Sequence, residues 1–256
     1  MMKLMEGKVA LVTGAGMGLG EACALALAEQ GATIMVADIN DSAGQETVDA
    51  IVREGGSASF VHCDVVDGEQ VKAMVDATIE TFGRLDCAVN NAGIVGTDGA
   101  ASVVDETEES FDKVIAIDLK GVFLCCKYEM AYMQTQGSGS IVNMSSVMGL
   151  NGINGSVAYP AAKHGVIGIT KSVALSGAAN GIRVNAVCPG IMRTPLVDNL
   201  VSQSGGAFEN YAIATTPMAR LGDAPEVAQA VTWLCSDAAS FVTGAALPVD
   251  GGFNAQ

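Results

Sequence analysis

Short apolar segments alternate with amphipathic segments along most of the chain. Seven segments are apolar and mostly rich in β-branched residues, and we expect strands at residues 8–12, 33–37, 59–63, 85–90, 140–144, 183–187 and 246–249. Apolar residues recur with the helical period in the segments 19–30, 41–54, 69–82, 110–133, 161–179 and 225–235. Strands that are apolar on both faces and separated by helices are typical of a parallel sheet covered on both sides. The pattern therefore predicts an α/β fold with a seven-stranded parallel sheet, in a single domain over residues 1–256.

The region between Pro189 and Pro225 departs from this alternation. It is irregular, with Gly205-Gly206 and scattered apolar residues. A long excursion inside a compact domain is more often functional than structural filler. A disordered surface loop is the alternative, but the apolar residues favour a substrate lid over residues 189–225. These are Ile191, Met192, Leu196, Leu200 and Phe208.

The amino-acid composition predicts a large hydrophobic core and contacts between subunits. Half of the 256 residues are hydrophobic, and the mean hydropathy is +0.37. Only 16% are charged, which is low for a small monomer, so we expect contacts between subunits. The net charge of −15 would repel nucleic acid, anionic membranes and acidic protein partners.

We expect a cytoplasmic protein without a metal site. No apolar run approaches the roughly 18 residues that span a bilayer, and the apolar run at residues 9–12 is too short for a signal peptide. With two histidines, His62 and His164, ligands at zinc-binding spacing are missing. No two of the seven cysteines form a C-x-x-C pair, and their apolar surroundings predict buried free thiols.

A glycine-rich loop follows the first predicted strand and opens the first predicted helix. Its spacing is G-x-x-x-G-x-G, with Gly14, Gly18 and Gly20. Such a loop lets the backbone approach a pyrophosphate, which binds at the free N–H groups of the helix. A merely tight turn is the alternative, but the position between strand and helix favours a dinucleotide site. The loop contacts we expect are Gly14, Met17, Gly18, Leu19 and Gly20.

The end of the second predicted strand favours NAD over NADP. Asp38 is placed to accept hydrogen bonds from the adenosine ribose hydroxyls and to repel a 2′-phosphate. No Arg or Lys stands at Met17 or Ile39 to receive that phosphate. The alternative is that Asp38 simply caps the following helix.

Tyr159 and Lys163 are four residues apart, so their side chains point the same way on a helix. A free tyrosine, with a pKa of about 10, is a poor base at neutral pH. A neighbouring ammonium and an oxidised nicotinamide both stabilise the phenolate, which lowers the pKa of a tyrosine toward the working range. Ser146, at the end of a predicted strand, is placed to donate a hydrogen bond to a substrate oxygen.

Taken together, these motifs resemble the short-chain dehydrogenases/reductases, and the resemblance covers residues 7–253. It rests on the glycine loop, Asp64-Val65, Asn90-Asn91-Ala92-Gly93, Ser146, Tyr159-x-x-x-Lys163 and Pro189-Gly190. The family implies a Rossmann fold, an NAD(P)-dependent oxidoreductase and a homotetramer.

The resemblance also implies roles for single residues. Tyr159 would be the general acid/base, Lys163 would lower its pKa and bind the nicotinamide ribose, and Ser146 would polarise the substrate oxygen. The adenine would lie at Asp64 and Val65, and the adenosine ribose at Asn91, Ala92 and Gly93. The nicotinamide would face Pro189, Gly190, Ile191 and Thr194.

Two positions depart from expectation. The family pattern has Asn where this chain has Asp118, and that Asn acts largely through its backbone carbonyl. We favour the same backbone role for Asp118, with a direct action of its carboxylate on Lys163 as the alternative. Pro160 lacks an N–H and disfavours a helical Tyr159, so the helix should begin within a few residues of it.

The expected substrate-lining positions are mostly apolar: Ile94, Val95, Met148, Ile153, Asn154 and Met192. They predict a hydrophobic or cyclic secondary alcohol or ketone as the small-molecule substrate. Segments 122–125, 240–244 and 250–253 look like those of dehydrogenases of cyclic alcohols and cyclohexadienediols. The alternatives are a 3-oxoacyl carrier-protein reductase, which Asp38 and the acidic charge oppose, and a non-catalytic NAD-sensing protein.

Overall fold

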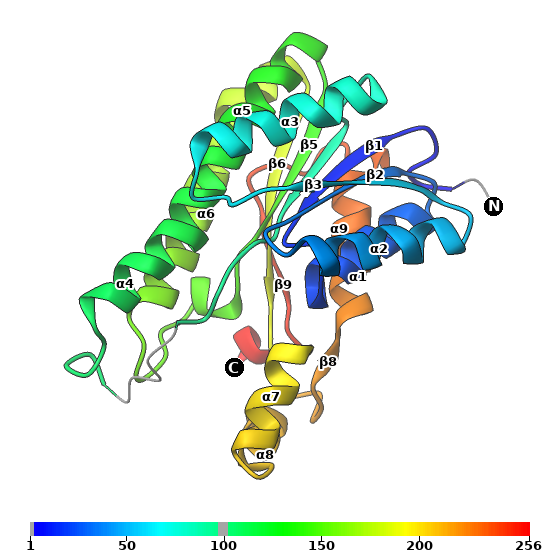
Figure 1. Ribbon diagram of the computed structural model, residues 1–256. Coiled ribbons are helices and arrows are strands. Elements are labelled where there is room, and N and C mark those ends of the chain that lie inside the picture. Colours follow the sequence, from blue (N-terminus) through cyan, green and yellow to red (C-terminus); the bar gives the residue numbers. More distant parts are fainter. Residues whose placement is uncertain (1–2, 97–101) are drawn as a thin grey trace.

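The strands form one parallel sheet. The computed structural model describes residues 3–96 and 102–256, and its main sheet has the order β3-β2-β1-β4-β5-β6-β9 (Figure 1). The strands are β1 (Val9–Thr13), β2 (Thr33–Asp38), β3 (Ser57–His62), β4 (Cys87–Asn90), β5 (Gly139–Met144), β6 (Ile182–Pro189) and β9 (Ala246–Val249). All six neighbouring pairs are parallel. The predicted seven-stranded Rossmann fold is therefore confirmed.

Helices cover both faces of the sheet (Figure 1). One core layer holds α1 (Gly18–Glu29), α2 (Asp41–Arg53) and α9 (Ala224–Cys235), and the other holds α3 (Gly68–Phe82), α5 (Val122–Gln136) and α6 (Ala158–Gly177). Successive residues of β1 enter opposite layers, with Ala10 and Val12 in the first and Leu11 in the second. This alternation explains why the strands are apolar throughout.

The predictions for the cysteines are also met. All seven are free and buried, and burial raises the pKa of the Cys23 thiol to about 12. The Cys23 thiol therefore stays protonated and unreactive at neutral pH. Within the ranges that the structure describes, no helix is both long and apolar enough to cross a bilayer.

The segment predicted as one helix over 110–133 is divided. It consists of α4 (Glu108–Val114), a π-helical turn (Ile115–Gly121) and α5. Such wide turns occur mostly at functional sites. Hydrophobic periodicity does not distinguish the two helix types over a single turn, which is why the prediction was wrong here. The π turn holds Asp118, whose side chain is completely buried.

The region 189–225 is more ordered than predicted. It contains β7 (Met192–Arg193), α7 (Pro195–Gln203), α8 (Ala207–Thr215) and β8 (Gly222–Asp223), and β7 pairs with β8. Helix α7 buries no residue, although Leu196, Val197, Leu200 and Val201 recur at helical spacing and give it one apolar face. Both helices project beyond the carboxyl ends of the strands (Figure 1).

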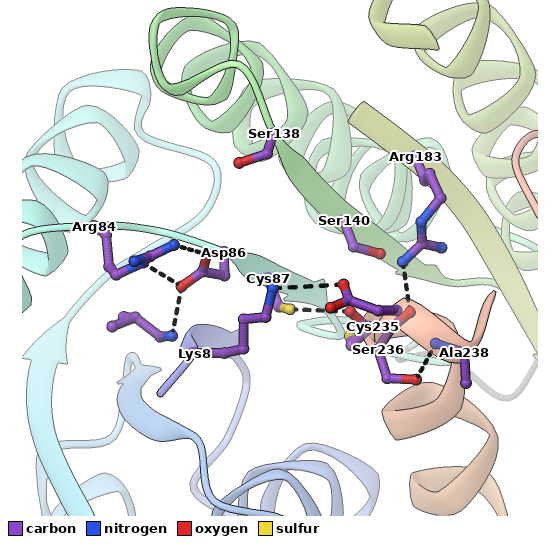
Figure 2. Close-up of polar contacts among 12 residues, drawn as sticks. Lys8, Arg84, Asp86, Cys87, Ser138, Ser140, Arg183, Cys235, Ser236 and Ala238 are labelled. Atoms are coloured by element: carbon purple, nitrogen blue, oxygen red, sulfur yellow. Dashed lines mark hydrogen bonds and ion pairs between the residues drawn. The ribbon is translucent and has the colours of Figure 1, made fainter. Parts of the chain in front are cut away.

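The amino-terminal edge of the sheet is occupied by internal polar contacts (Figure 2). The Asp86 carboxylate accepts a hydrogen bond from Val9 N at 2.9 Å and pairs through both oxygens with Arg84 at 2.7 Å. The Arg183 guanidinium donates to the Ser236 carbonyl at 3.0 Å. These groups fasten strands and loops to one another, whereas the sequence motifs gather at the opposite edge.

The carboxyl group of Glu129, on α5, is fully buried and belongs to a polar network between α5 and the sheet. Asn90 Nδ2 donates to Glu129 Oε2 and to Asn143 Oδ1, both at 3.0 Å, and Asn143 Nδ2 donates to Thr170 Oγ1 at 3.0 Å. Burial raises the pKa of Glu129 to about 7, although the hydrogen bond from Asn90 lowers it. The network joins α5, β4, β5 and α6.

This raised pKa makes stability depend on pH. Between the ordinary pKa of 4.5 and about 7, the folded state keeps the Glu129 proton and the unfolded state releases it, so stability falls as the pH rises. Glu129→Gln keeps an acceptor for Asn90 without the charge. Relative to the wild type, we expect the free energy of unfolding of this variant to increase by about 2–3 kcal/mol between pH 5 and pH 8.

Urea unfolding at several pH values measures this difference. Glu80→Gln, at an exposed position on α3, is the matched control and should differ from the wild type equally at all pH values. A pH-independent difference for Glu129→Gln would contradict the prediction.

Candidate functional site

The glycine loop has the shape that the sequence predicts. Gly14 has a φ of +61°, and a Cβ at this position would lie 2.8 Å from Ala92 Cα. A Cβ at Gly20 would lie 2.0 Å from the Gly14 carbonyl oxygen, so side chains are excluded at both positions. Helix α1 begins at Gly18, and its N-cap residue Met17 supplies no side-chain cap. The loop and the helix start therefore fit a pyrophosphate.

Asn91 fastens this loop to β4. Its Nδ2 donates to the carbonyl oxygens of Thr13 at 3.1 Å and Gly14 at 3.0 Å. In return, Thr13 Oγ1 accepts hydrogen bonds from the backbone N–H groups of Asn91 and Ala92. The side chain of Asn91, expected at the adenosine ribose, thus holds the loop in place.

Asp38 lies at the end of β2, directly opposite the glycine loop. Its Oδ2 accepts a hydrogen bond from Gly16 N at 2.8 Å, and its Oδ1 accepts one from Asn40 N at 2.9 Å. Asn40, not Asp38, caps α2, because the Asn40 side chain accepts from Ala43 N. The alternative interpretation of Asp38 as a helix cap is therefore wrong. Each carboxylate oxygen has a second lone pair available for a ribose hydroxyl.

The residues expected around Asp38 lie at the same edge. Met17 and Ile39 are both more than half exposed, at 55% and 61%. Asp64 follows β3 and its Oδ1 accepts from Val66 N at 3.1 Å, while Val65 is buried against Gly121 of the π turn. An adenosine group bound at this edge would contact the Asp38 carboxylate and the apolar side chains beside it.

Ser146, Tyr159 and Lys163 come from two segments that are tied together. Ser146 follows β5, and its Oγ accepts a hydrogen bond from Met148 N at 3.1 Å. Tyr159 lies in the first turn of α6, and the buried Lys163 Nζ is 5.4 Å from the centre of its ring. Lys163 Nζ donates to the Met144 carbonyl at 3.2 Å.

A serine that sequence reasoning missed strengthens this tie. Ser145 Oγ donates to the Lys163 carbonyl at 2.9 Å, which links the end of β5 to α6 a second time. Helix α6 begins two residues before Pro160, as expected, although Tyr159 is itself helical. Proline is well tolerated in a first turn, so its effect on Tyr159 was overestimated.

The Asp118 carboxylate contacts Lys163 and the backbone at Ile94 in this structure. Its Oδ2 lies 2.9 Å from Lys163 Nζ, and its Oδ1 accepts a hydrogen bond from Ile94 N at 2.8 Å. The favoured interpretation, a role for the backbone alone, does not account for these contacts. Burial lowers the pKa of Lys163, but the attraction of Asp118 and Tyr159 outweighs burial, and the pKa lies above its ordinary 10.5. Gly93 leaves room for the pair, because a Cβ there would lie 3.0 Å from Asp118 Oδ2.

The expected substrate-lining residues divide into two groups. Ile94 packs with Val114, Ala158 and Tyr159. Val95, Ile153 and Asn154 are exposed, and Met148 is half-buried. Met192, by contrast, is 5% exposed and packs on Gly222, so its predicted role in lining the substrate site is not supported.

The start of the lid lies close to the glycine loop. A Cβ at Gly18 would lie 3.7 Å from Thr194 Cβ, which places Thr194 beside the start of α1. Thr194 also caps α7, since its side chain accepts from Val197 N. Pro189 ends β6, and Gly190 and Ile191 follow it, with Gly190 packed closely on Asp250. Of the residues predicted to face the nicotinamide, Thr194 is therefore the one that the structure places beside the glycine loop.

A cavity of about 350 Å³ lies beside the residues that follow β6. Its lining includes Gly190, Met192, Arg220 and Asp250 but none of Ser146, Tyr159 and Lys163. We therefore do not assign the substrate to it.

Comparison with known proteins adds relatives of similar length. Residues 14–254 match the family model described as enoyl-(acyl carrier protein) reductase. The chain is similar to cyclohexanol dehydrogenase of Acinetobacter sp., with 43% identity over 98% of this chain and 96% of that protein. It is also similar to 2,5-dichloro-2,5-cyclohexadiene-1,4-diol dehydrogenase of Sphingobium indicum, with 42% identity over 98% of both. A third relative is the 3-oxoacyl-[acyl-carrier-protein] reductase of Thermotoga maritima, with 41% identity over 97% of this chain and 98% of that protein.

Solved structures agree with these relatives. Levodione reductase superimposes with a TM-score of 0.93 at 40% identity, covering 98% of this chain and 99% of its own. A candidate 2-deoxy-D-gluconate 3-dehydrogenase of Agrobacterium tumefaciens, solved with bound NADP, has a TM-score of 0.90 at 36% identity, covering 100% and 99%.

Proposed function

The chain belongs to the short-chain dehydrogenase/reductase family, and from this premise we propose that it is an NAD-dependent alcohol dehydrogenase and ketone reductase. It would transfer hydride between NAD(H) and a hydrophobic or cyclic secondary alcohol or ketone. The observation that carries the proposal is the placement of the buried Lys163 ammonium 5.4 Å from the Tyr159 ring, beside the segment that ends in Ser146.

Each of these side chains would have one task. Tyr159 would take the hydroxyl proton during alcohol oxidation and return it during ketone reduction. The positive charge of Lys163 would stabilise the phenolate, and its ammonium would also hold the nicotinamide ribose. The Ser146 hydroxyl would donate a hydrogen bond to the substrate oxygen, where negative charge develops. The bound nicotinamide supplies the site that accepts or donates the hydride.

The preference for NAD rests on Asp38. A 2′-phosphate would meet this carboxylate and the uncharged side chains of Met17 and Ile39, so repulsion would not be offset. The NADP-bound relative supports the opposite choice, because it shows that related proteins accept the phosphorylated cofactor. We give more weight to Asp38 than to this relative, because Asp38 is a residue of this chain at the position where the 2′-phosphate would lie.

The relatives and the lining residues both support a ring-shaped substrate. Two relatives are named for cyclohexanol and a cyclohexadienediol, and Ile94 belongs to the same apolar cluster as Tyr159. The second candidate, a 3-oxoacyl carrier-protein reductase, is favoured by the Thermotoga relative. The net charge of −15 opposes it, since the carrier protein is acidic.

We also propose a cytoplasmic homotetramer. The charged fraction of 16% is low, and large apolar side chains such as Leu175 and Phe241 are 83% and 103% exposed in the isolated chain. The seven unpaired cysteines fit a reducing compartment.

The cofactor proposal predicts the effect of changing Asp38. Asp38→Ser combined with Ile39→Arg removes the repulsive carboxylate and adds a partner for the phosphate. The ratio of kcat/KM for NADP to that for NAD should rise by about 10- to 1,000-fold. Steady-state kinetics with both cofactors measure this, and a wild type that already prefers NADP would refute the role of Asp38.

The proton-transfer proposal predicts the effect of removing the Tyr159 hydroxyl. Tyr159→Phe should lower kcat by at least about 100- to 10,000-fold. Binding of NADH, followed by its fluorescence, should be unchanged because only proton transfer is lost. Tyr132→Phe, which removes an exposed hydroxyl bonded to the Gly83 carbonyl, is the control and should keep full activity. Near-normal turnover of Tyr159→Phe would eliminate the mechanism.

The Asp118–Lys163 pair predicts a shifted pH–rate profile. The Asp118 carboxylate partly cancels the charge that Lys163 presents to Tyr159, so Asp118→Asn should strengthen stabilisation of the phenolate. The acidic limb of kcat/KM for alcohol oxidation should therefore move to lower pH by up to about one unit, equivalent to about 1.4 kcal/mol. Asp112→Asn, at an exposed position on α4, should leave the profile in place. Superimposable profiles for Asp118→Asn and the wild type would make the carboxylate purely structural.

A further inference from the structure

The helix that carries Tyr159 has no cap from its own sequence. Its N-cap residue is Val157, whose apolar side chain offers no acceptor to the first N–H groups of α6. Ser, Thr, Asp or Asn would be the usual residue there. An uncapped first turn is the part of a helix that frays most readily.

Glu106 supplies the missing cap from a distant part of the sequence. Its Oε2 accepts a hydrogen bond from Val157 N at 2.8 Å. The Ala158 N–H is shared between the two oxygens, at 3.2 and 3.3 Å. The Ser156 hydroxyl donates to Oε1 at 3.0 Å. One carboxylate therefore holds three consecutive residues that lead directly into Tyr159.

Glu106 is itself fixed at a helix start. The next residue, Thr107, is the N-cap of α4, and its hydroxyl accepts from Ser110 N at 3.1 Å. Val114 at the other end of α4 packs with Ala158 and Tyr159 in the same apolar cluster. Helix α4 thus contacts the start of α6 through a carboxylate at one end and an apolar side chain at the other.

Tyr159 is consequently held from both sides. One turn further along α6, Lys163 is anchored by the Met144 carbonyl and by Asp118. Without Glu106, the first turn would be free to move while Lys163 stayed in place. Such motion would change the distance between the Tyr159 hydroxyl and Lys163, which is the distance on which the proposed chemistry depends.

We propose that Glu106 is a positioning residue that fixes the first turn of α6 and so aims the Tyr159 hydroxyl. The proposal rests on the proposed function and deepens it. Misplacement of a reacting group by about 1 Å lowers rates by about 100-fold, so the effect should appear in kcat. A carboxylate that only stabilised the fold would lower the melting temperature and leave kcat unchanged.

The test compares Glu106→Ala, Glu106→Gln and a matched control in the full-length protein. Asp67→Ala removes a carboxylate cap of the same kind, because Asp67 Oδ1 accepts from Glu69 N and Gln70 N at the start of α3. Melting temperature, kcat and KM for a cyclic secondary alcohol, and the Kd for NADH are measured for each variant.

Glu106→Ala should lower kcat by about 10- to 100-fold and change KM and the NADH Kd by less than about threefold. Glu106→Gln keeps an acceptor oxygen and should recover most of the activity. Asp67→Ala should lose a similar amount of thermal stability and keep its kcat within about twofold. If Glu106→Ala also keeps its kcat within about twofold, Glu106 is an ordinary structural cap and the proposal is wrong.

Hydrogen exchange provides a readout that does not depend on turnover. Amides of residues 157–163 should exchange faster in Glu106→Ala than in the wild type and at nearly the wild-type rate in Glu106→Gln, while those of α3 remain unchanged in both. Unchanged exchange in Glu106→Ala would overturn the positioning role even if activity fell. A wild type that exchanges as expected but oxidises no secondary alcohol would refute the proposed function instead, and would leave the anchoring of α6 supported.

Discussion

The arrangement at the carboxyl edge of the sheet depends on two opposite charges that are buried together. Lys163 and Asp118 are 4% and 0% exposed, and 2.9 Å separates their charged atoms. Burial of either charge carries a desolvation cost, which the attraction between the two groups offsets here. The surrounding backbone is shaped to admit the pair. A π turn carries Asp118 inward, a glycine at position 93 leaves space, and the Met144 carbonyl accepts a further Lys163 hydrogen bond.

This pair also connects the apolar residue Ile94 with the polar group of Tyr159. Asp118 holds the backbone at Ile94, where the apolar wall begins, and Lys163 faces Tyr159. The position at which this chain has Asp instead of its family's Asn therefore contacts both the lysine beside Tyr159 and the backbone at Ile94.

Local patterns in the sequence were sufficient for the sheet and for the motifs at its edge. Strands such as β1 are buried on both faces, and their unbroken apolar runs leave little doubt about their type. The glycine loop, Asp38 and the Tyr159–Lys163 pair were found because spacing alone places them on one turn or one strand end. The helices α7 and α8 were missed although α7 has an apolar face, because each is only nine residues long and an apolar pattern of that length is hard to assign to one element type. The contact of Asp118 with Lys163 was only the less favoured alternative, and the contacts of Glu106 were missed, because the partners lie 45 and about 50 residues away and only the folded chain brings them together.

The short parallel pairing of β7 with β8 has a consequence for how such a protein can change over evolutionary time. Met192 and Arg193 lie against Gly222 and Asp223, so the excursion between them leaves and rejoins the domain at one place. Because β7 and β8 close the base of this segment, the chain between them can become longer, shorter or different in sequence. Its two attachment points then stay the same distance apart. The sequences of α7 and α8 can then diverge without altering the strand ends at which the proposed cofactor-binding and catalytic residues lie. Exchange of this segment between relatives is therefore a change that the fold can accept without moving those residues.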